Sequence, residues 1–118
     1  MVDAVLSSST LSGDDVVNRD GDKLGTLKEI MIDLARGDVA YAVVARGGLA
    51  GIGEKLFAVP WEMFDVDVEA HELILDIAED VLDNSPGFDP DHWPSFSDQE
   101  WRTQVHEYYG LAPYRGDR

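Results

Sequence analysis

Short β-type segments separated by turns rich in glycine and aspartate run through the first two thirds of this chain. Apolar side chains recur at every second position, as in Ile30, Ile32 and Leu34, which is the period of a β-strand. No convincing helix interrupts the segments, so the pattern predicts a mainly β fold, a small six-stranded antiparallel barrel or sandwich, and disfavours a βαβ fold. The six segments span residues 16–17, 23–34, 39–46, 55–61, 65–69 and 73–77.

Two of these segments predict local structure as well. Leu24 has the inward parity of its segment but Leu27 does not, and a β-bulge near Gly25 would reconcile the two positions. The segment 39–46 is apolar on both faces, so we expect it to be covered on both sides.

The last third of the chain has a different pattern. Residues 78–84 predict about two helical turns, which Ser85-Pro86-Gly87 should end. Ser97 and Glu100 have the spacing of a capping box at the start of an amphipathic helix, and Gly110 should end that helix. The expected organisation is a flexible lead-in at residues 1–10, a barrel domain at 11–88 and an acidic aromatic extension at 89–118, with a helix over about 98–109.

Acidic residues outnumber basic ones by 24 to 9, and residues 62–118 hold 15 of the acidic residues and 3 of the basic ones. This acidic face argues against direct binding of nucleic acid and against an electrostatic anchor on anionic lipid. The chain has no cysteine, which excludes disulfides, thiol nucleophiles and cysteine-ligated metals. It has neither a secretory signal pattern nor an apolar run of bilayer length, so we expect a cytoplasmic protein without membrane insertion.

Three patterns could suggest a ligand, and each has a structural reading. The glycines of 47–53 precede a strand rather than a helix, which favours a tight crossover over a phosphate loop. Residues 18–29 have the ligand spacing of a calcium loop, but Lys23 stands where that loop needs glycine, which favours a hairpin turn. Asp89, Asp91 and His92 could form a weak metal site, although a solvated turn explains them better.

The sequence assigns no catalytic, cofactor or metal residue. Carboxylate pairs such as Asp65 and Asp67 are abundant, but an acidic face produces such pairs by chance, and a catalytic pair needs environments that separate the two pKa values. We therefore expect that the protein is not an enzyme.

Aromatic residues concentrate in the last quarter of the chain. They either pack on the barrel as a flap of helix and loop, or form a recognition surface, for which aromatic residues in an acidic surround are suitable anchors. The candidate interaction surface comprises Trp93, Phe96, Trp101, Val105, Tyr108 and Tyr109.

The order of strands and turns resembles the PRC-barrel family, which includes the barrel of the photosynthetic reaction centre H subunit and stand-alone bacterial proteins. The resemblance rests on residues 16–18, 20–25, 29–33, 41–44 and, most specifically, 47–61, which read GGLAGIGEKLFAVPW. The motif residues that we expect to be structural are Gly21, Gly25, Gly48, Gly51, Gly53, Pro60 and Trp61.

The resemblance implies a six-stranded barrel that contacts other macromolecules and has no general catalytic site. It favours a non-enzymatic adaptor or assembly module acting through protein–protein contacts, expected here as a homodimer and suited by its charge to a basic protein partner. Two alternatives remain open. One is a regulatory domain that binds a small ligand or a metal; the other is a soluble factor for photosynthetic-complex or ribosome assembly.

Overall fold

The computed structural model describes residues 4–47 and 53–112. Two of the expected motif glycines, Gly48 and Gly51, lie outside the described residues. The elements in chain order are α1 (Ser8–Leu11), β1 (Asp15–Val17), β2 (Lys23–Asp33), β3 (Asp38–Arg46), β4 (Lys55–Pro60), η1 (Trp61–Met63), β5 (Phe64–Asp67), β6 (Glu72–Leu75), α2 (Glu79–Asp83), β7 (Gly87–Phe88) and α3 (Gln99–Tyr108).

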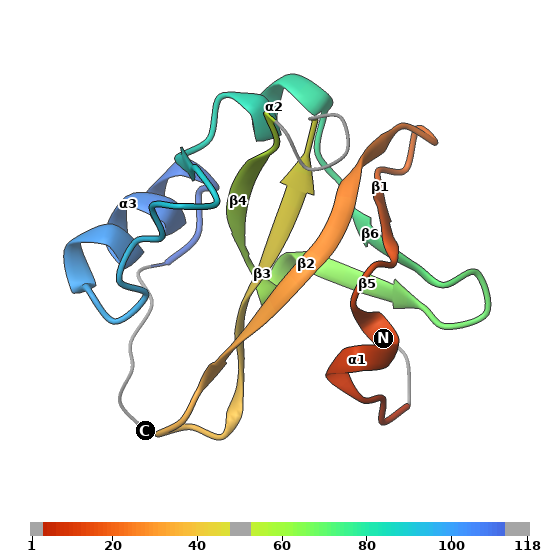
Figure 1. Cartoon of the computed structure of the whole chain (residues 1–118), viewed down its shortest axis with the longest axis horizontal. Coiled ribbons are helices and arrows are strands. Elements are labelled where there is room, and N and C mark those ends of the chain that lie inside the picture. The colour runs from red at the N-terminus through yellow and green to blue at the C-terminus, as the bar shows by residue number, and fades with distance from the viewer. Residues whose placement is uncertain (1–3, 48–52, 113–118) are drawn as a thin grey trace.

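The described strands form one curled sheet in the order β5-β6-β1-β2-β3-β4-β7 (Figure 1). The prediction of a mainly β fold is confirmed, but the six antiparallel strands are corrected to seven, with β1 parallel to β6. The sheet is not closed, because β5 and β7 stand at its two ends. Alternating side chains indicate that a strand exists but not the direction of its partner, and the two residues of β7 are too few to show a period.

Strand β2 contains the predicted bulge. Val16 of β1 pairs with Gly25 and Val17 pairs with Lys23, so that Leu24 is the extra residue between them. Leu24 and Leu27 are consequently both buried, despite their odd spacing. The prediction of a bulge near Gly25 is confirmed.

Strand β3 is covered on both faces, as its two apolar faces predict. Ala42 and Val44 belong to the main core inside the curled sheet. Val43 and Ala45 point to the other face, where they form a second cluster with Leu56 of β4. Phe96 of the C-terminal extension and Phe88 of β7 pack against this second cluster, so the chain covers its own central strand.

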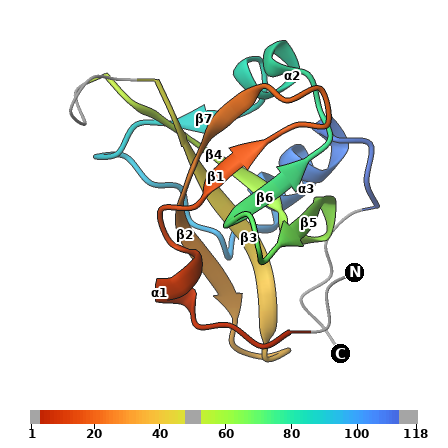
Figure 2. The same ribbon diagram turned by 90° about the vertical axis from the view of Figure 1, so that its right-hand side faces the viewer.

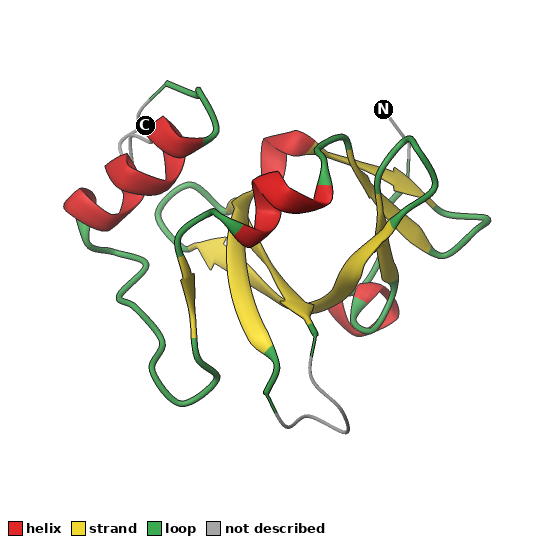
Figure 3. Cartoon of the chain, turned by 90° about the horizontal axis from the view of Figure 1, so that it is seen from above, coloured by secondary structure: helices red, strands yellow, loops and turns green. Residues whose placement is uncertain are grey.

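Helix α3 lies on the opposite side of the strands from α1 (Figure 3). Its N-cap is Asp98 rather than the predicted Ser97, and the Asp98 carboxylate accepts a hydrogen bond from the Glu100 amide at 3.1 Å. A carboxylate at this position also favours the helix through the dipole, which a serine hydroxyl does not. Gly110 ends the helix with a φ of 71°, as predicted.

The loop between β1 and β2 is a hairpin turn built on Asn18. The Asn18 Oδ1 atom accepts hydrogen bonds from the amides of Asp20 and Asp22, and Nδ2 donates to the carbonyl of Ile77. Gly21 follows with a φ of 89°, which glycine adopts without strain. The oxygen that would begin a calcium loop therefore already accepts two backbone bonds, which favours the hairpin interpretation.

Arg46, at the end of β3, holds α2 against the sheet. Its guanidinium bonds to Asp83 at 2.7 Å, to Glu79 at 2.8 Å and to the carbonyl of Leu24 at 2.8 Å. The hydrogen bonds to the two carboxylates raise the pKa of Arg46 above its usual value. This network fixes the acidic short helix on the nearly neutral first half of the chain.

Replacing Gly25 by alanine tests the close approach of β2 to β3. An added Cβ would collide with the carbonyl oxygen of Ala45 and press on Val44, so we expect Gly25→Ala to lower the free energy of unfolding by about 3 kcal/mol. Urea denaturation measures this loss. Gly37→Ala is the control, because its Cβ meets nothing within 4 Å and only its φ of 74° opposes the change, at about 1 kcal/mol. Equal losses would contradict the steric account.

Candidate functional site

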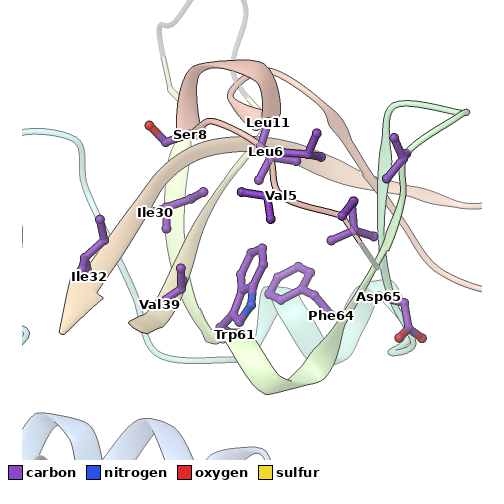
Figure 4. A pocket seen from close by; sticks show the side chains of 13 residues that line it. Val5, Leu6, Ser8, Leu11, Ile30, Ile32, Val39, Trp61, Phe64 and Asp65 are labelled. Carbon is purple, nitrogen blue, oxygen red and sulfur yellow. The ribbon is translucent and has the colours of Figure 1, made fainter. Parts of the chain in front are cut away.

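An apolar groove lies beside the part of β2 that β1 leaves unpaired. Strand β1 pairs only with the first part of β2, up to Thr26, so the remainder of β2 extends beyond its neighbour. The curl of the sheet brings β5 to the other side of this gap; β1, β6 and β5 lie side by side in Figure 2. The groove between them has a volume of about 590 Å³ (Figure 4).

Two aromatic rings form the floor of the groove. Trp61 follows Pro60 at the end of β4, and the 3-10 turn that it begins carries the chain into β5 at Phe64. The ring centroids of Trp61 and Phe64 are 5.8 Å apart, and both side chains also pack against the main core. Trp61, predicted as a structural motif residue, therefore has one side available to the groove.

One wall comes from the central strands β2 and β3, and the other comes from β5 and the residue after it. Ile30, Ile32 and Val39 line one side, while Val66 and Val68 line the other. Ile32 remains 57% exposed. This part of the apolar wall is therefore open to solvent.

The N-terminal segment lies over the groove without filling it. Helix α1 is anchored by the buried Leu11, and its N-cap Ser7 accepts a hydrogen bond from the Thr10 amide at 3.1 Å. Ahead of the helix, Val5 and Leu6 line the groove, yet Val5 is fully exposed. Part of the predicted lead-in is thus helical, and it adds apolar surface to the site.

The predicted interaction residues lie mainly between the C-terminal extension and the sheet. Tyr41 of β3 is buried, and its ring centroid is 5.7 Å from that of Phe96 and 5.3 Å from that of Trp101. Val105 is fully buried, because it faces the sheet from α3. Tyr109 packs against the main core, and burial raises the pKa of its hydroxyl to about 12.

Two residues of the predicted surface keep substantial exposure. Trp93 donates a hydrogen bond through Nε1 to the carbonyl of Pro90, and Tyr108 donates to the carbonyl of Val81. Both side chains are more than one third exposed. The structure thus favours the packed flap over a single aromatic recognition surface, and Val105 in particular offers no surface to a partner.

His106 is a buried histidine of α3 with a defined tautomer. Its Nδ1 lies 3.0 Å from the carbonyl oxygen of Ala112, which can only accept, so Nδ1 carries the hydrogen. Nε2 then accepts from the Tyr41 hydroxyl at 3.0 Å. Desolvation by burial lowers the pKa of His106, and nearby Arg102 contributes to the same direction.

Neither the groove nor the rest of the described chain brings together the side chains that catalysis or metal binding would need. No three His, Asp or Glu side chains within residues 4–47 and 53–112 come together as a metal site requires. The turn at 89–92 is organised by its own backbone, since the His92 amide donates to the carbonyl of Asp89. Asp65, the ionisable residue that lines the groove, pairs with Arg19 at 2.7 Å.

A family model matches about two thirds of the chain. The family model for the PRC-barrel domain matches residues 3–82, which include β1 through β6. The chain belongs to the PRC-barrel domain family. The match contains all of the groove residues and ends before β7 and α3, so the extension that covers β3 lies outside it.

No curated protein matches the chain. Among solved structures, it is similar to RimM from Pseudomonas aeruginosa, a protein named for 16S ribosomal RNA processing, with a TM-score of 0.42 and 20% sequence identity. The similarity covers 64% of this chain and 45% of that one, so this PRC-barrel protein spans less than half of its neighbour's length. Every helix among the described residues is too short or too polar to cross a membrane.

Sequence reasoning did not predict the groove. Ile30, Ile32 and Leu34 share one face of the predicted segment 23–34, which is much longer than the segment 16–17 before it. This difference in length is the sequence signal that could have indicated the groove. A strand that outruns its neighbour leaves apolar side chains uncovered. The position of β5 across the gap has no such signal, because it depends on the parallel pairing of β1 with β6.

The buried neutral His106 predicts a pH-dependent stability. Because its folded pKa lies below the usual 6.5, the unfolded chain takes up a proton first as the pH falls. We expect the free energy of unfolding to decrease below about pH 6.5 and this contribution to be constant above it. Urea denaturation from about pH 7.5 to 5.5 measures the slope, and NMR titration of the imidazole measures the pKa directly.

Substitution of two histidines separates this effect from other titrations. His106→Asn should remove the decrease, whereas His92→Asn, on an exposed turn, should keep it. An imidazole of His106 that titrates at or above 6.5 would contradict the assignment.

Proposed function

We propose that this PRC-barrel protein is a non-enzymatic adaptor that binds a segment of a partner protein in the apolar groove. The main support is that apolar side chains line the groove and are incompletely covered, with Ile32 57% and Leu6 39% exposed. Burying such surface against a partner is favourable at roughly 25 cal/mol per Å².

The chemistry of the groove supports a binding role over catalysis. Within the described residues, Asp65 is the one ionisable residue that lines it, and its carboxylate points away from the cavity (Figure 4). The buried groups whose pKa is shifted, His106 and Tyr109, belong to the C-terminal extension instead. General acid–base catalysis needs a titratable group directed at the substrate.

The charge of the chain supports a partner that carries basic residues. The net charge is −15, and complementary charge increases the association rate and disfavours acidic partners. We therefore expect binding that weakens as salt screens these charges.

The expected homodimer is not part of this proposal. The two apolar faces of the strand 39–46 and the aromatic helix are the features that would favour a dimer, and the chain itself covers both. Tyr41 and Val43 are buried under the extension, and Val105 of α3 is buried on the same face.

A small apolar ligand is the second candidate. The groove volume of about 590 Å³ lies within the range of small-molecule sites, roughly 300–1,000 Å³. Native mass spectrometry of the protein purified from its source distinguishes the two, because a retained small molecule would favour this candidate.

A photo-crosslinking amino acid at position 34 tests the adaptor role. Leu34 is 90% exposed and lies two residues after Ile32, in the turn that follows β2, so we expect a defined protein adduct from this position. The same group at Gln104, an exposed residue of α3, should give none. Ile32→Lys should reduce the adduct at least tenfold by placing a charge in the groove.

Stability separates binding from folding in this experiment. Because Ile32 is mostly exposed, Ile32→Lys should change the free energy of unfolding by less than about 1 kcal/mol, as should the matched Gln104→Lys. An adduct that persists in folded Ile32→Lys, or that forms equally from position 104, would reject the groove as the docking site.

A further inference from the structure

Strand β5 presents an unpaired edge next to the groove. It is the last strand of the sheet and pairs with β6 on one side. Within residues 4–47 and 53–112, the one backbone bond from its other side joins the Phe64 amide to the carbonyl of Trp61. Because backbone groups alternate along a strand, the N–H and C=O of Val66 point outward on the same side as the Phe64 amide.

One face of strand β5 is apolar and the other is acidic. Phe64 and Val66 line the groove on the inner face. Asp65 and Asp67 alternate with them on the outer face, and Glu72 of β6 stands opposite Asp67. Arg19 is the basic side chain that reaches this outer face, and its ion pair with Asp65 is more than half exposed on both partners, so it contributes little.

We propose that the groove binds an extended partner segment that adds to β5 as a new antiparallel strand, with apolar residues alternating with Lys or Arg. The apolar side chains enter the groove beside Phe64 and Val66, and the basic ones lie beside Asp65 and Asp67. Main-chain bonds to an exposed edge supply affinity in this mode of recognition, while alternate side chains supply specificity. This inference rests on the proposed function, since it specifies the occupant of the same groove.

A second copy of the chain fits the edge poorly. If two β5 strands paired about a two-fold axis at Val66, Asp65 of each copy would stand directly opposite Asp67 of the other. Like charges in directly opposed positions destabilise a strand pair. The same carboxylates that attract a basic segment therefore discourage self-association, a common protection of exposed edges.

The probe is the capped peptide Lys-Val-Lys-Ile-Lys-Val-Lys, added to the full chain labelled with ¹⁵N. We expect saturable binding and at least tenfold slower hydrogen exchange of the Val66 amide, which the new strand would occupy. The matched control peptide replaces each lysine by glutamate and should bind at least tenfold more weakly. A peptide of the same composition with its apolar residues adjacent should also bind weakly.

Backbone methylation tests the strand geometry without altering the protein. In antiparallel addition, the residue opposite Val66 is apolar and its amide points at β5. Methylating the amides of the apolar residues should weaken binding at least tenfold, whereas methylating the lysine amides should change it less than about twofold. Equal effects of the two modifications would overturn strand addition.

The outcomes separate this inference from the adaptor role. If no peptide binds while position 34 still crosslinks to a protein, the strand mode is wrong and the adaptor role stands. If both experiments fail, both proposals are wrong. Sedimentation that shows a dimer dissociated by the peptide would overturn the choice of occupant in favour of a second copy.

Discussion

Burial of strand β3 on both faces is the constraint on which the other features of the molecule depend. Its inner face contributes Ala42 and Val44 to the core inside the curled sheet. Its outer face would be exposed in a minimal barrel, and the C-terminal extension covers it through contacts around Tyr41. The aromatic and amphipathic features of the last quarter of the chain are thus needed to complete one strand.

Where β1 ends, by contrast, the sheet leaves an apolar face that the chain does not cover completely. The part of β2 that extends past β1 has no strand to cover it, and short α1 covers only a little of its surface. Ile32 consequently lines a groove rather than a core, and Ile30 lies between the core and the groove. The same fold therefore contains one apolar face that the chain covers itself and one that it leaves open to a partner.

Sequence reasoning predicted what local chemistry determines. The strand period, the bulge at Gly25 and the glycine that ends α3 all follow from side-chain parity or backbone freedom at single positions. The predicted N-cap, Ser97, differs by one residue from the observed Asp98 because both side chains can cap a helix. The groove and the parallel pairing were missed because both depend on which strands meet, and neighbours distant in sequence leave no mark on the period of either strand.

The pairing of Asp15 with Glu72 and of Val17 with Ile74 determines the order in which the chain can assemble. Strands β2, β3 and β4 are joined by consecutive antiparallel pairs and can form from local contacts. Strands β1 and β6 meet only after the whole intervening chain has been brought together, and that closure costs entropy before any contact compensates for it. The face that bears the groove therefore cannot be completed until β6 has been synthesised, whereas β2, β3 and β4 can already pair before that point.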